Sequence, residues 1–271
     1  MGHNATTQRS DLYLFVVLSC ILSWSLWGLI IASARGWISV SIPLNPWGSF
    51  GPAVAAVLVV WRSRGGKGVR SLLGPLIRWR WGLTWWIVVL AGPLALVGVA
   101  VAVLPLLGTE LSAAPSIPWG QMALLLPVIL VVGGPLGEEI GWRGYALPEL
   151  LRKQGPIAAS LVVAGIWMFW HLPLFWVPGA TQEKSSIIVF LALVLALSIL
   201  TTWIYLETNR SLLAAVMFHF SINVSTYYVP LIWPSVDGLV LFDEVLVVVV
   251  WLAAIAATLR LWRHRYAEER G

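Results

Sequence analysis

The chain has 271 residues, of which 59% are hydrophobic and only 11% charged, and its mean hydropathy is +0.86. A water-soluble domain carries roughly 25% charged residues, and a disordered chain is poor in apolar residues, so both classes are excluded. The formal net charge of +5 is attributed to basic loops beside a lipid bilayer, and no nucleic-acid partner is expected. The composition predicts a single membrane domain over residues 1–271.

Eight apolar stretches are candidates for helices that cross a hydrocarbon layer about 30 Å thick. In chain order they cover residues 12–34, 46–61, 85–107, 119–137, 156–177, 186–206, 211–229 and 245–262. Their apolar residues are continuous instead of alternating, which favours helices over strands. We therefore expect an all-α polytopic transmembrane bundle of about eight spans. The stretch 69–81 mixes basic and apolar residues and predicts an interfacial helix.

The basic residues predict the orientation of these spans. With the N-terminus in the cytoplasm, 15 of the 17 Lys and Arg residues fall on the cytoplasmic side, and only Arg35 and Lys184 fall outside. Because cytoplasmic loops of membrane proteins are rich in Lys and Arg, we expect both termini inside the cell. The expected location is the plasma (cell inner) membrane.

Several ionisable or strongly polar side chains lie within or beside the predicted spans. An ionisable group at the centre of a membrane helix costs about 2.5–3.5 kcal/mol on insertion scales, so such groups are usually functional. The candidates are Glu138, Glu139 and Arg143 at the end of the fourth span, His171 in the fifth, and His219 and Asn223 in the seventh.

Helical geometry divides these candidates into pairs. Glu139 and Arg143 are four residues apart, which favours an ion pair, and His219 and Asn223 share one helix face by the same spacing. Glu138 is rotated about 100° from Glu139 and is expected to turn into the bundle. A carboxylate that is not compensated there is suited to act as a general base.

The predicted depths of these groups differ. His219 lies about 12 Å from the inner end of its span and His171 about 22 Å, whereas Glu138 is at the inner edge. They meet only if the fourth span extends deeper than 119–137 and the fifth helix begins in the cytoplasm. The sequence Gly133-Gly134-Pro135 permits a kink or close packing there.

Other interpretations remain open from the residues alone. The acidic pair could begin an amphipathic helix, His171 could bond a carbonyl freed by Pro173, and His219 with Asn223 could join two helices. At the level of function, Glu138, His171 and His219 could form the relay of a proton-coupled transporter. A non-catalytic scaffold or immunity protein is the third alternative.

Three motifs in this order, Glu138-Glu139-x-x-x-Arg143, an aromatic-x-x-x-His171 element and His219-x-x-x-Asn223, resemble the CPBP (CAAX protease and bacteriocin-processing, or Abi) family. This family of intramembrane endopeptidases includes the type II CAAX prenyl proteases. The resemblance covers residues 119–229, the expected catalytic core. One departure is visible, because the family often has Phe four residues before the His.

The resemblance implies hydrolysis of a peptide bond inside the membrane, with the site towards the cytoplasm. Glu138 would activate a water molecule with help from His171, and His219 and Asn223 would stabilise the oxyanion. The substrate would be a membrane-associated peptide or protein, with prenylated CAAX proteins as one class.

The resemblance also gives Glu139 and Arg143 a supporting role. Family members are commonly labelled metalloproteases, and Glu138, His171 and His219 would be the ligands of a zinc ion. The glutamate-and-water mechanism uses the same residues, and no cofactor is therefore assigned. The sequence predicts no oligomeric state.

Overall fold

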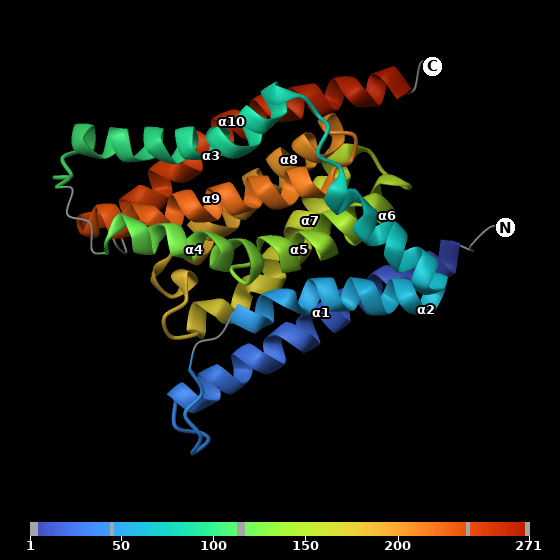
Figure 1. Ribbon diagram of the computed structural model, residues 1–271, viewed down its shortest axis with the longest axis horizontal. Helices are drawn as coiled ribbons and strands as arrows, with labels where there is room; N and C mark the ends of the chain where they lie inside the picture. The colour runs from blue at the N-terminus through green and yellow to red at the C-terminus, as the bar shows by residue number, and fades with distance from the viewer. Residues whose placement is uncertain (1–4, 44–45, 113–116, 237–238, 269–271) are drawn as a thin grey trace.

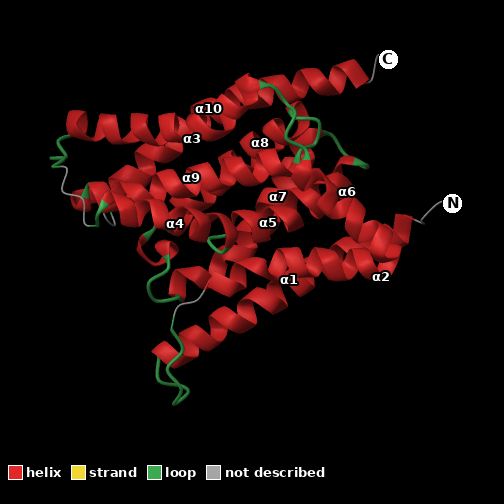
Figure 2. Cartoon of the chain, in the orientation of Figure 1, coloured by secondary structure: helices red, strands yellow, loops and turns green. Residues whose placement is uncertain are grey.

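The structure is a computed structural model that describes residues 5–43, 46–112, 117–236 and 239–268, and it contains helices and no strand within these ranges (Figure 2). The all-α prediction is therefore confirmed. The helices are α1 (Ala5–Ala34), α2 (Gly51–Leu73), α3 (Leu83–Val103), α4 (Trp119–Val131), α5 (Pro135–Gly141), α6 (Leu147–Leu151), α7 (Pro156–His171), α8 (Ile187–Glu207), α9 (Leu212–Ile232) and α10 (Val240–Glu268).

Seven segments of the described chain are long and apolar enough to cross a membrane, where the sequence predicted eight. The missing one is the predicted span 46–61. Its helix, α2, carries Arg62, Arg64, Lys67 and Arg70 and is kinked at Gly65, where φ is +60°, so its apolar part is short. Helix α2 still runs back along α1 (Figure 1). The part of α2 after the kink at Gly65, together with the short turn η2 (Gly74–Ile77), overlaps the stretch 69–81 where an interfacial helix is predicted; its place at the interface stays a prediction.

The fourth span is longer and more irregular than its predicted range 119–137. Helix α4 stops before Gly133-Gly134, α5 begins at Pro135, and a turn of π-helix, η4 (Trp142–Ala146), joins α5 to α6. The candidate span covers Trp119–Leu151, 33 residues. Glu138 thus lies well inside the span, as the depth argument required.

Helix α1 begins and α10 ends at the same end of the molecule (Figure 1), because α2, which is not one of the seven candidate spans, also runs back along α1. The sidedness predicted from the basic residues stays a prediction. Of those residues, Arg270 lies outside the described chain, and the side chains of Arg9, Arg263 and Arg265 are likewise not described.

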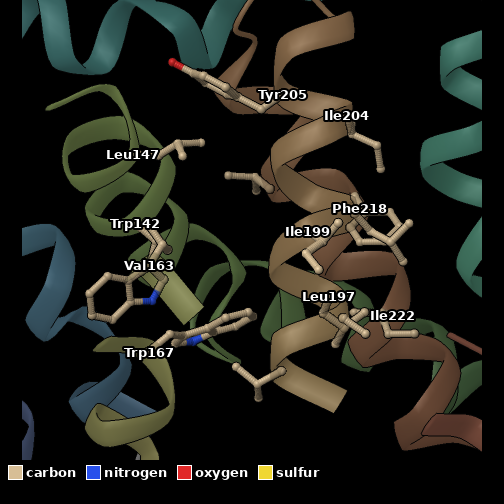
Figure 3. Close-up of a cluster of buried hydrophobic side chains, with 14 of the residues drawn as sticks. Trp142, Leu147, Val163, Trp167, Leu197, Ile199, Ile204, Tyr205, Phe218 and Ile222 are labelled. Atoms are coloured by element: carbon tan, nitrogen blue, oxygen red, sulfur yellow. The ribbon is translucent and has the colours of Figure 1, made fainter. Parts of the chain in front are cut away.

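Helix α9 is at the centre of the bundle. It packs against α3, α4, α5 and α8 and is the most buried of the seven candidate spans. Buried apolar side chains of η4, α7, α8 and α9 form the core beside it (Figure 3). This position carries the polar residues of α9 into the interior of the protein.

Two glycines one helical turn apart bring α5 against α2 and the turn that precedes it. A Cβ atom on Gly137 would lie 2.5 Å from the Ser49 carbonyl oxygen, and one on Gly141 would lie 2.5 Å from Pro52 Cβ. Small residues allow helix backbones to approach closely in membrane proteins. The contact holds α5 on one side and leaves its other faces for Glu138 and Glu139.

Candidate active site

The ion pair predicted from the spacing of Glu139 and Arg143 is present. Arg143 Nη1 donates to Glu139 Oε1 at 2.9 Å, and both side chains are 0% exposed. A buried pair of this kind is costly to break, because the remaining charge is left without compensation in a medium of low polarity. The pair therefore holds the end of α5 and the beginning of η4 in one arrangement.

Helix α9 joins this pair through His219. Its Nδ1 lies 2.9 Å from the same oxygen, Glu139 Oε1. A carboxylate only accepts hydrogen bonds, so Nδ1 carries the hydrogen and Nε2 is left for another partner. Glu139 thereby positions His219, a role that adds to its pairing with Arg143.

Trp167 of α7 connects the members of the site. Its Nε1 donates to Glu138 Oε2 at 2.5 Å, and its ring lies over the Arg143 guanidinium, 4.8 Å from centroid to carbon, a cation–π contact. The ring centroids of His171 and His219 are 5.6 Å and 5.4 Å from that of Trp167. From the sequence we expected only aromatic packing here. The bond to Glu138 is one that the family's common Phe cannot make.

His171 follows Trp167 by one turn and is buried. Its Nδ1 lies 2.9 Å from the Trp167 carbonyl oxygen, so this nitrogen is the donor, and a neutral ring keeps its lone pair on Nε2. His171 therefore bonds a backbone carbonyl, but that of Trp167 and not the Phe169 carbonyl whose usual donor Pro173 removes. The other nitrogen is available for chemistry.

The break between α4 and α5 brings Glu138 and Asn223 together. Gly134 has φ +113°, and a Cβ atom there would lie 2.4 Å from Glu138 Oε1 and 3.8 Å from Asn223 Nδ2. Asn223, half-buried on α9, donates from Nδ2 to the Gly133 carbonyl at 3.1 Å. The glycine pair thus leaves room for a carboxylate and an amide beside the backbone.

The candidate residues chosen from the sequence therefore gather between α5, α7 and α9. Gly134 and the indole of Trp167 are members that sequence reasoning missed. The conditional zinc set does not fit, because nowhere in the described residues do three His, Cys, Asp or Glu side chains come together in a way that could hold a metal ion. No step is therefore derived through zinc.

Part of the chain is similar to known proteins. Residues 119–225 match the family described as type II CAAX prenyl endopeptidase Rce1-like. A curated relative, "CAAX prenyl protease 2" of the archaeon Methanococcus maripaludis, is 35% identical over 94 residues. That match covers 32% of this chain and 35% of the relative, so it spans about a third of the archaeal protein. The family match over residues 119–225 includes all six candidate residues.

Proposed function

Residues 119–225 match the type II CAAX prenyl endopeptidase Rce1-like family, and from this premise we propose that the protein is an intramembrane endopeptidase. It hydrolyses a peptide bond of a membrane-associated substrate, with a prenylated CAAX protein as one candidate class. The observation that carries the proposal is the convergence of Glu138, His171, His219 and Asn223 from three helices around Trp167. We place the catalytic core within 119–229 of a single membrane domain, facing the cytoplasm from the plasma membrane.

Glu138 is the general base in this proposal. Its Oε2 is bound by Trp167 Nε1, which leaves Oε1 beside Gly134 to take a proton from water. The water oxygen bonds to the substrate carbonyl carbon while the proton moves to Glu138, and His171 Nε2 orients the water through its lone pair. When the C–N bond breaks, Glu138 returns the proton to the departing amine.

The negative charge that develops on the carbonyl oxygen needs hydrogen-bond donors that are already in place. Asn223 Nδ2 is one donor. His219 is the second in its doubly protonated form, because Nδ1–H is committed to Glu139 and only the imidazolium also has a hydrogen on Nε2. The Glu139 carboxylate stabilises that positive ring. This assigns Glu139 and Arg143 to positioning and charge balance, outside the reacting atoms.

The test is cleavage of a labelled peptide panel, including a farnesylated CAAX peptide, by the purified full chain in detergent. Glu138→Gln and His171→Ala run beside the wild type, and Glu110→Gln, a carboxylate in the loop after α3 and away from the site, is the matched control. We expect cleavage to be lost in the first two variants and retained in the control.

Two results would overturn the proposal. One is cleavage by Glu138→Gln at the wild-type rate. The other is pH-dependent solute uptake in vesicles that Glu138→Gln abolishes while no peptide is cut, which would favour the proton-coupled transporter. A cellular function that survives Glu138→Ala and is lost on changes to the helix surface would favour the scaffold.

A further inference from the structure

A cavity of about 230 Å³ lies between α2, η2, η4, α6 and the loop that joins α8 to α9. Its charged lining residues are Arg64, Arg78, Arg143, Arg152, Arg210 and Glu149. Arg143 is compensated by Glu139, so the other four guanidinium groups exceed the one lining carboxylate by three positive charges around a small volume. Such a concentration of one sign attracts an anion.

Arg143, which also lines this cavity, is buried and has two donors that are unpaired within the described chain. Arg143 is 0% exposed, yet its Nε and Nη2 have no hydrogen-bond partner among the described residues. Native structures rarely leave buried donors unpaired, but both atoms are enclosed by protein. An anion in the cavity would instead meet the exposed guanidinium groups that line it, those of Arg64, Arg78, Arg152 and Arg210, and a guanidinium edge matches the spacing of two phosphate oxygens.

The other arginines are held around the opening. Glu149 pairs with both Arg64 and Arg152, and Arg78 Nη1 donates to the Asn209 carbonyl at 3.1 Å. Ser211 Oγ in turn donates to the Arg78 carbonyl at 2.6 Å. The backbone at Arg210 has φ +56°, a conformation rarely used by residues other than glycine. The loop therefore carries strain where it lines the cavity.

The cavity lies near a surface suited to lipid. Ile77, Trp79 and Leu83 are exposed large apolar residues on either side of Arg78, and Trp is common at the level of lipid head groups. Tyr205 also lines the cavity, and its hydroxyl points away from the hydrophobic core (Figure 3). An anion in this cavity would meet donors on the protein side and apolar groups on the bilayer side.

We propose that this cavity binds a phosphate group, supplied by the head group of an anionic phospholipid. Basic pockets between membrane helices recognise such head groups through phosphate oxygens. The site is separate from the proposed peptidase chemistry and does not rest on it. Arg143 is the only member that the two share.

The experiment titrates phosphatidylglycerol into the delipidated full chain and counts bound lipid by native mass spectrometry, with phosphatidylcholine as the neutral lipid. Arg64→Gln/Arg210→Gln removes two charges from the cavity. Lys67→Gln/Arg70→Gln removes two charges from exposed positions of α2 that do not line it. Thermal unfolding in phosphatidylcholine nanodiscs verifies that both variants are folded.

We expect one phosphatidylglycerol to bind more tightly than phosphatidylcholine, and its Kd to rise at least about tenfold in the cavity variant, because charge-assisted bonds to phosphate are lost. The control variant should stay within about twofold. Displacement of the lipid by millimolar inorganic phosphate would show that the site recognises the phosphate group and not the rest of the lipid. Equal binding of the two lipids, or equal weakening in both variants, would overturn the proposal.

Discussion

Replacing Gly134 with alanine tests whether the break between α4 and α5 positions the carboxylate of Glu138. The added Cβ atom would lie 2.4 Å from Glu138 Oε1, where ordinary contact begins at 3.4 Å. The oxygen must therefore move by about 1 Å. Its movement is restrained, because the other oxygen of the same carboxylate accepts the hydrogen bond of Trp167.

Two effects of different size follow from this geometry. A side chain at φ +113° costs about 1–3 kcal/mol of stability. A displacement of about 1 Å in a catalytic group lowers the rate on the order of 100-fold. We therefore expect kcat/KM to fall about 100-fold while the protein remains folded, since a carboxylate can rotate away more easily than a backbone can.

The assay is peptide cleavage by the purified variant, with the midpoint of thermal unfolding measured on the same sample. Gly165→Ala is the matched control, because Gly165 is on α7, within two turns of His171, and a Cβ atom there meets nothing within 4 Å. The control should cleave at the wild-type rate. Wild-type activity in Gly134→Ala would refute the placement of Glu138 Oε1 as the reactive oxygen.

Three further predictions use the same assay and the same unfolding measurement. Trp167→Phe keeps the aromatic packing but removes the hydrogen bond to Glu138. Because a hydrogen bond to a charged group is worth about 1.5–3 kcal/mol, kcat/KM should fall at least about tenfold. An unchanged kcat/KM would show that the indole does not position the base. Glu139→Gln should lower the free energy of unfolding by about 3–5 kcal/mol, because Arg143 is left buried and unpaired. Adding Arg143→Met to this variant should recover part of the lost stability. If the effects of the two substitutions on stability simply add, the two residues are not a coupled pair. A tight zinc chelator should leave cleavage unchanged, since the described part of the chain assembles no donor set for a metal, whereas loss of activity that added zinc restores would require a metal mechanism.

Local relations in the site were predictable from the sequence. Glu139 and Arg143 pair because four residues make one helical turn, and this distance is independent of the rest of the fold. The break at Gly133-Gly134-Pro135 was likewise predictable, because proline cannot continue the hydrogen-bond ladder of α4. The longer fourth span follows from that break, which lets the chain continue past the range 119–137.

Relations between helices were beyond the sequence. The hydrogen bond from Trp167 to Glu138 depends on how α7 is rotated against α5. The two residues are 29 positions apart, and no sequence spacing of that length predicts a contact. The use of one Glu139 oxygen by both Arg143 and His219 has the same origin. The prediction of the span 46–61 failed for another reason. The hydropathy of a short window does not take into account the basic residues that follow it in α2.

The close contact of α5 with the turn before α2 has a consequence for genetics. The helix that carries Glu138 rests on backbone atoms through Gly137 and Gly141, and behind them a Cβ atom on Gly51 would lie 2.0 Å from Ser23 Oγ. Replacing any of these three glycines with a larger residue would displace Glu138 from its partners, although none of the three contacts the substrate. A screen for inactive alleles should therefore recover substitutions in this small-residue seam as often as in the catalytic motifs.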